Sequence, residues 1–200
     1  MTTPTRRRGR LILAAVTAAV AVVAISAIAL AQPGRPAGPA FPPLHPAAAP
    51  ASWRHVMLPD GTAVLSYPPG LRPLAGDKDA VSVARLSPGG AFQLYLNATP
   101  RQGSEGLAHW AAFRLHLLRS DAAASARQVA AAQGIKFRGG TGSCVMDQYV
   151  TRIGGHHFQE IACLVQGHTS ASVVVAAAPA AQWATAQPLL LRAVAAYLIN

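Results

Sequence analysis

Residues 142–165 read GSCVMDQYVTRIGGHHFQEIACLV, and this stretch decides how the second half of the chain folds. Apolar and polar residues alternate on both sides of Gly154 and Gly155, which is typical of two strands joined by a short turn. We therefore predict strands over residues 143–152 and 157–166, paired as an antiparallel hairpin.

The register of this hairpin decides the state of Cys144 and Cys163, the two cysteines of the chain. If Thr151 pairs with His156 across a four-residue loop, Cys144 lies directly opposite Cys163 and a disulfide can form. A tighter turn centred on the glycines places Cys163 opposite Met146 instead. We favour the first register, because the N-terminal leader exports the chain and unpaired thiols are uncommon outside the cytoplasm.

A metal site in this region would have to draw on Cys144, Cys163, His156, His157 and His168. Adjacent residues of a strand point to opposite faces of the sheet, so His156 and His157 are poorly placed to share one ion. No C-x-x-C or H-x-x-x-H spacing occurs. We predict no metal site, no bound cofactor and a solvated histidine pair.

A catalytic centre is not favoured either. Cys144 and His157 could form a thiol–imidazole pair only if the cysteine were free. The favoured register sets Asp147 opposite Glu160, which is an unfavourable pair of like charges and the one carboxylate pair that can be placed from the sequence. Because no G-x-S-x-G, S-x-x-K or H-E-x-x-H motif is present, we predict no catalytic residues.

The N-terminus begins with a cluster of arginines in TRRRGR, residues 5–10, followed by an uncharged apolar run over residues 11–31. Such a run is long enough to cross a bilayer, and the arginines favour a cytoplasmic N-terminus. Ala29-Leu30-Ala31 resembles a signal-peptide cleavage site, whereas the length of the run favours a retained anchor. Both alternatives place the rest of the chain outside the cytoplasm, either anchored by a single span or released after cleavage near Ala31.

Residues 32–52 hold seven prolines and predict an extended linker, so the domains expected are a leader over 1–31, this linker, and a globular domain over 53–200. The whole chain has a formal charge of +10, but residues 32–200 contain 13 basic and 7 acidic residues, a net charge of +6. The arginines are scattered singly, without a basic stripe interleaved with aromatic residues. We therefore predict no nucleic-acid binding.

Turn signals and periodicity predict the elements of the domain. The helix that begins near Ser104 carries an apolar face that includes Arg114, whose stem we expect to reach outward to solvent rather than to pair with a buried carboxylate, and His109 and His116 fall on its exposed side. The expected strands cover residues 62–67, 80–86, 91–98, 135–138, 143–152, 157–166 and 171–178, and the expected helices start at 104, cover 121–133, and cover 179–199 with an interruption at Pro188. This order predicts an α+β fold in which helices cover an antiparallel sheet.

The layout of Trp53, LPDG (58–61), YPPG (67–70), GLAHWAAFR (106–114) and VVVAAAP (173–179) resembles exported actinobacterial proteins of the LpqN type. That resemblance implies the α/β/α sandwich of PsbP-like proteins and an extracytoplasmic binding or accessory role. The resemblance implies no catalytic residues, and the lipid-bearing cysteine common in that family is absent from this sequence.

We therefore expect a non-enzymatic, extracytoplasmic domain that binds a protein or polymer of the bacterial cell envelope, with membrane contact through the N-terminal segment if it is not cleaved. The alternative is an envelope hydrolase or thiol enzyme with an unrecognised site. A third hypothesis is an apolar ligand carried in a cavity under the helices, suggested by the Ala- and Val-rich stretch at 171–178.

Overall fold

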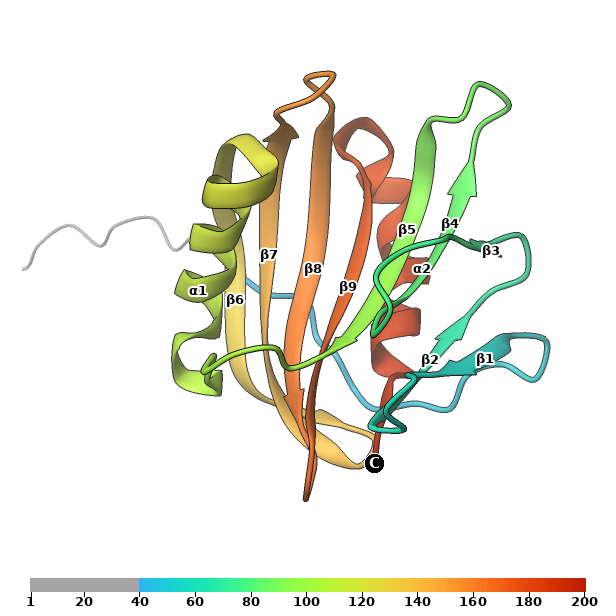
Figure 1. Ribbon diagram of the computed structural model, residues 1–200, viewed down its shortest axis with the longest axis vertical. Helices are drawn as coiled ribbons and strands as arrows, with labels where there is room; N and C mark the ends of the chain where they lie inside the picture. The colour runs from blue at the N-terminus through green and yellow to red at the C-terminus, as the bar shows by residue number, and fades with distance from the viewer. Residues whose placement is uncertain (1–39) are drawn as a thin grey trace, which may run out of the picture. The chain divides into compact units, whose positions relative to one another are not determined.

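The computed structural model describes residues 40–200 and confirms an α+β fold. A seven-stranded antiparallel sheet forms its centre, with helices on both faces and a small three-stranded sheet beside it (Figure 1). The large sheet has the order β3 (Arg72–Pro73), β4 (Val81–Leu86), β5 (Phe92–Pro100), β9 (Ala171–Pro179), β8 (His157–Gln166), β7 (Gly140–Thr151) and β6 (Ala123–Phe137). The small sheet has the order β1 (Arg54–Met57), β2 (Ala63–Tyr67) and β10 (Leu198–Ile199).

The first helical region lies over β6, β7 and β8 (Figure 1). It comprises a 3-10 turn η1 (Leu107–His109), the helix α1 (Trp110–Leu117) and a π-helical turn η2 (Leu118–Ala122). Trp110 is buried against Val145, Ala162 and Val175 of the sheet, and its indole N–H donates to the Ala162 carbonyl at 2.9 Å. The predicted start at Ser104 is wrong, because the turn follows Gly106 and makes no side-chain cap.

The second helical region packs on the opposite face and encloses the main core with the small sheet. It comprises a 3-10 turn η3 (Ala180–Gln182) and the helix α2 (Trp183–Ala195). Pro188 lies inside α2 on its exposed side and does not end the helix. The prediction of a helix to residue 199 is wrong, because the chain leaves α2 after Ala195 and closes the small sheet as β10.

The Ala-rich stretch after η2 differs from its predicted helix over 121–133. It forms the first part of β6, a 15-residue edge strand paired along β7. Three irregularities interrupt the pairing, so the buried residues of β6 are Ala123, Ala130 and Phe137, seven positions apart. The predicted helix is wrong because it rested on the alanine-rich composition, which favours a helix, whereas pairing with β7 makes this stretch a strand.

Part of the predicted linker is packed against the domain. Phe41, Leu44 and Ala49 contact the main core, and the Ala47 amide donates to the Ala195 carbonyl at 3.0 Å. The predicted leader over residues 1–31 and the linker up to residue 39 lie outside the described residues. Within residues 40–200, no helix is long and apolar enough to cross a membrane.

Candidate functional site

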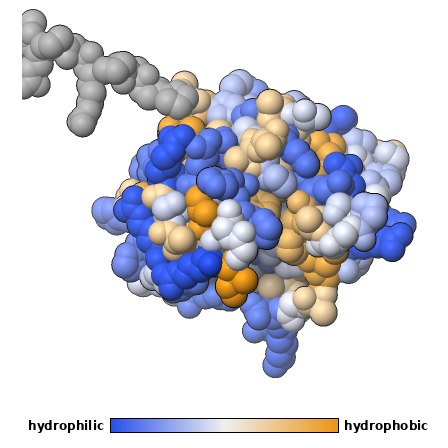
Figure 2. All heavy atoms as spheres, turned by 90° about the horizontal axis from the view of Figure 1, so that it is seen from above, coloured by the Kyte–Doolittle hydropathy of each residue, from blue (hydrophilic) through white to orange (hydrophobic). Residues whose placement is uncertain are grey.

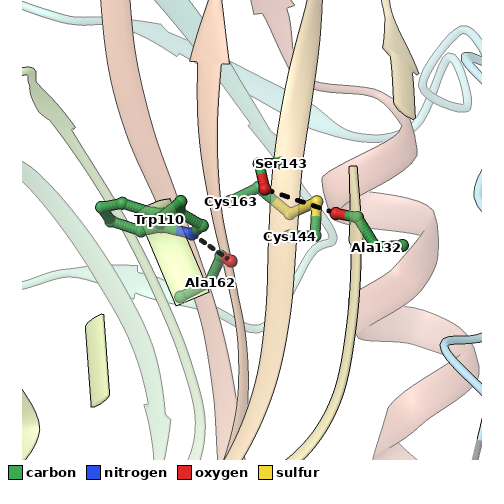
Figure 3. Close-up of a disulfide and its surroundings, with 6 residues drawn as sticks. All are labelled: Trp110, Ala132, Ser143, Cys144, Ala162 and Cys163. Atoms are coloured by element: carbon green, nitrogen blue, oxygen red, sulfur yellow. Dashed lines mark hydrogen bonds between the residues drawn. A yellow bond between two sulfur atoms is a disulfide. The ribbon is translucent and has the colours of Figure 1, made fainter. Parts of the chain in front are cut away.

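The hairpin of β7 and β8 has the favoured register. The Thr151 amide donates to the His156 carbonyl at 2.9 Å and closes the four-residue loop, so Cys144 lies opposite Cys163. The two residues form a disulfide with 4.1 Å between their Cα atoms, buried in the main core (Figure 3). Since no cysteine is free between residues 40 and 200, the thiol-enzyme alternative has no nucleophile in this structure.

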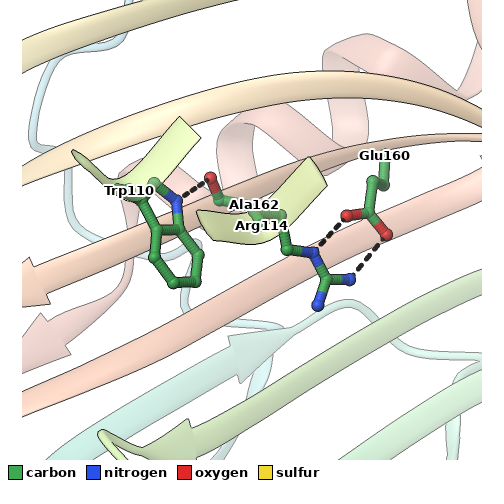
Figure 4. A network of polar contacts seen from close by, with 4 residues as sticks. All are labelled: Trp110, Arg114, Glu160 and Ala162. Atoms are coloured by element: carbon green, nitrogen blue, oxygen red, sulfur yellow. Dashed lines mark hydrogen bonds and ion pairs between the residues drawn. The ribbon is translucent and has the colours of Figure 1, made fainter. Parts of the chain in front are cut away.

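Arg114 pairs with a buried carboxylate, so the expectation that its side chain reaches outward is wrong. Its Nε donates to Glu160 Oε1 at 2.7 Å and its Nη2 donates to Oε2 at 2.9 Å, as Figure 4 shows. Glu160 lies on β8 directly under α1 and is almost completely buried. The bidentate ion pair therefore joins α1 to β8, and its two charges balance each other.

Asp147 lies opposite Glu160 on β7, as the register requires. Its side chain is fully buried, and neither carboxylate oxygen has a hydrogen-bond partner. Burial, followed by the charge of Glu160, raises the pKa of Asp147 to about 7, although Arg114 and Arg119 act in the opposite direction. Burial, followed by the charge of Glu160, also raises the pKa of Tyr149 above its ordinary value.

This carboxylate pair fits a structural role better than glycosidase chemistry. Asp147 and Glu160 both lie beneath α1 and are shielded from solvent. A glycosidase pair must contact a sugar from two sides of the scissile bond. In this conformation Glu160 is held by the Arg114 guanidinium and Asp147 is fully buried on the neighbouring strand, so neither carboxylate faces solvent.

The histidines do not converge. His156 and His157 lie at one end of β8, whereas His168 follows the other end of the same strand, and all three are exposed. Residues 40–200 contain no group of three histidine, cysteine, aspartate or glutamate side chains that could hold a metal ion. His109 and His116 are exposed, as predicted.

A large hollow lies at the end of the molecule where two hairpins project. Its volume is about 920 Å³, and it is lined by the β4–β5 turn, the end of η2, the β7–β8 turn and the start of η3. We call this region, centred on residues 87–92 and 152–157, the hairpin end; both turns lie at the top of Figure 1. The aromatic rings of Phe92 and Phe158 and the ring of Pro179 give the hollow an apolar lining.

The rim of the hollow presents apolar side chains to solvent. Ile153, at the tip of the β7–β8 turn, is 90% exposed, and Phe92 of the other hairpin is 42% exposed. Leu86 is 43% exposed and ends β4 beside the same turn, but it does not line the hollow. Figure 2 looks down on this end and shows apolar residues at the surface among polar ones. No sequence pattern indicates this region, because its walls come from four segments that are distant in the chain.

Within residues 40–200, the structure does not contain the predicted cavity for an apolar ligand between α2 and the sheet. The space between α2 and the sheet, lined by side chains such as Leu71, Leu96 and Leu190, is too small for a water molecule. The Val- and Ala-rich strand β9 is buried by ordinary core packing against both helical regions. A large open space lies at the hairpin end instead.

The fold is that of the PsbP-like α/β/α sandwiches. The cyanobacterial PsbP of Synechocystis sp. PCC 6803 has a TM-score of 0.54 and 12% identity, with 76% of this chain and 95% of that chain covered. LpqN of Mycobacterium tuberculosis, described as involved in cell envelope biogenesis, has a TM-score of 0.48 and 14% identity, with 74% and 90% covered. At these identities the PsbP match shows a shared fold alone.

No protein-family model matches the sequence, and no curated protein is significantly similar to it. The predicted resemblance is therefore supported for the fold, while membership of the LpqN type stays a prediction.

Proposed function

We propose that this protein is a non-enzymatic binding or accessory domain of the bacterial cell envelope, located outside the cytoplasm. The arginine cluster and apolar run at the N-terminus support export. The buried Cys144–Cys163 disulfide agrees with an oxidising compartment. Asp147 and Glu160 lie buried beside Arg114, and both cysteines are joined in the disulfide, so the proposal rests on the exposed surface and favours binding.

The observation that carries this proposal is the hairpin end. It combines a hollow of about 920 Å³, lined in part by the exposed side chains of Ile153 and Phe92, with a third exposed apolar side chain, Leu86, at the end of β4. Exposed apolar groups gathered in one place are typical of interaction sites. The turns stand on long paired strands of the sheet, so a rigid scaffold positions the binding surface.

The proposal is tested by crosslinking in intact cells that produce the protein. A photoreactive benzoylphenylalanine replaces Ile153 or Phe92, and Met57 serves as the matched control because it is 59% exposed and lies on β1. We expect light-dependent adducts at Ile153 and Phe92 and none at Met57. Adducts of equal yield at all three positions, or at none, would contradict a binding role for the hairpin end.

A further inference from the structure

The hairpin end has features that distinguish a lipid surface from other partners. Of the five exposed large apolar side chains in residues 40–200, three lie there: Leu86, Phe92 and Ile153. They belong to two separate hairpins that project from the same end of the sheet (Figure 1). Two protruding apolar tips at one end can enter the same planar surface together.

Ile153 protrudes instead of filling a pocket. It follows Arg152 and precedes Gly154 and Gly155, which both have positive φ angles of 79° and 61° and build a narrow tip without side chains. With 90% of its surface exposed, Ile153 offers almost its whole side chain to a partner that can surround it. The boundary between lipid headgroups and acyl chains surrounds a protruding side chain in this way and gains free energy from its burial.

The charges of this region indicate which lipids would be bound. Arg152 lines the hollow, and its Nη2 donates to the carbonyls of Arg119 and Ser120 at 2.8 and 2.7 Å, which fixes its charge at the base of the tip. Arg119 and Arg85 are exposed on the neighbouring segments, and Asp121 is the acidic residue of the lining. The positive excess is complementary to anionic headgroups, which attract basic residues close to a membrane surface.

We infer that the hairpin end docks onto an anionic lipid bilayer, with Ile153 and Phe92 inserted at the level of the headgroups. This inference rests on the proposed binding role of the same surface and names its partner. Exposed apolar side chains supply the insertion, and the arginines supply a preference for negative charge that salt weakens.

The test uses the full chain with a single added thiol. Because Cys144 and Cys163 are joined and buried, Ile153→Cys, Phe92→Cys and Met57→Cys each give one accessible thiol for an environment-sensitive nitrobenzoxadiazole label. Each labelled protein is mixed with vesicles of phosphatidylcholine alone or of phosphatidylcholine with phosphatidylglycerol. The Met57 label controls for proximity that the N-terminal apolar segment alone would cause.

We expect a blue shift and stronger emission at residues 153 and 92 with the anionic vesicles, a smaller change with neutral ones, and no change at residue 57. Raising the salt from about 50 mM to about 500 mM should reduce the signal, since it shortens the screening length several-fold. Equal signals at residues 57 and 153, or none at 153, overturn the lipid inference. If residue 153 then crosslinks to a protein in cells, the binding role stands; if it crosslinks to nothing, both proposals fail.

Discussion

Asp147 is buried beside Glu160 with neither of its carboxylate oxygens hydrogen-bonded. Arg114 is already engaged in two hydrogen bonds with Glu160, so one guanidinium faces two carboxylates. Ionising both acids would leave an uncompensated negative charge under α1. The cluster is therefore most stable when Asp147 holds a proton, which agrees with its raised pKa of about 7.

This protonation predicts how stability depends on pH. The pKa of Asp147 is about 7 in the folded protein against an ordinary value of 3.8, so the folded state binds the extra proton between these values. The free energy of unfolding should consequently fall as the pH rises from about 4 to about 7, by at most roughly 4 kcal/mol for this group. Asp147→Asn cannot ionise and should flatten that dependence.

Urea denaturation at a series of pH values measures this effect. The matched control is Asp121→Asn, because Asp121 is an exposed aspartate outside the cluster. Asp147→Asn should be more stable than the unchanged protein at pH 8 and lose the advantage near pH 4. A variant whose stability follows that of the unchanged protein at every pH would show that Asp147 does not titrate in this window.

At the same scale, the sequence predicted the positions of these groups but not their environment. The hairpin register placed Asp147 opposite Glu160, and the structure confirms that pairing. The outward reach expected for Arg114 was wrong, because its partner is 46 residues away and is set by where α1 crosses β8. Helical periodicity places a residue on a face of its helix, whereas the partner depends on the packing of two elements.

At the scale of elements, turn residues predicted the hairpins more reliably than alanine content predicted a helix. The hairpins β4–β5 and β7–β8 follow their glycine-containing turns and were predicted correctly. Much of strand β6 was predicted as a helix because residues 121–133 are rich in alanine, which favours helices. Pairing with β7 overrides the helix preference, and a single sequence does not reveal that pairing.

The turn between β6 and β7 carries a prediction of its own. Gly139 has a φ of +83°, and a Cβ atom there would overlap the carbonyl oxygen of Ile199 in β10. The Ile199 amide donates to the Arg138 carbonyl at 3.0 Å, so this contact holds the C-terminal strand against the large sheet. Gly139→Ala should both strain the backbone and displace β10.

Gly155→Ala is the matched control, because Gly155 has a φ of +61° and no atom within 4 Å of an added Cβ. The control should lose about 1–2 kcal/mol of unfolding free energy from backbone strain alone. Gly139→Ala should lose more than the control, and amide hydrogen exchange of residues 198–199 should accelerate only in Gly139→Ala. Equal losses in the two variants would mean that the turn and β10 are not coupled.

At the scale of the whole molecule, the order of the elements in the sequence predicted the fold class. The hollow at the hairpin end could not be predicted from the sequence. Residues 92 and 152 are 60 positions apart in the chain, and the two turns meet because β5, β9 and β8 are neighbours in the sheet. The order of strands in space, which local sequence patterns do not reveal, therefore creates the candidate site.

The position along the chain at which the folded domain begins also depends on the whole molecule. The Pro-rich composition predicted a linker up to residue 52, yet Phe41 and Leu44 are half-buried against the main core. Proline prevents regular pairing but does not prevent an extended segment from burying its apolar side chains. Residues 40–52 consequently act as part of the domain.

Replacing both Phe41 and Leu44 by alanine in the full chain should reduce the free energy of unfolding by about 2 kcal/mol, since each half-buried side chain contributes roughly 1 kcal/mol. His45→Ala is the control, because His45 is exposed on the same segment and its loss should leave stability unchanged. Urea denaturation followed by tryptophan fluorescence provides the measurement, since Trp53 and Trp183 belong to the same core. If the double variant is as stable as His45→Ala, residues 40–52 do not stabilise the domain, and the proline-rich segment acts as a spacer up to Trp53.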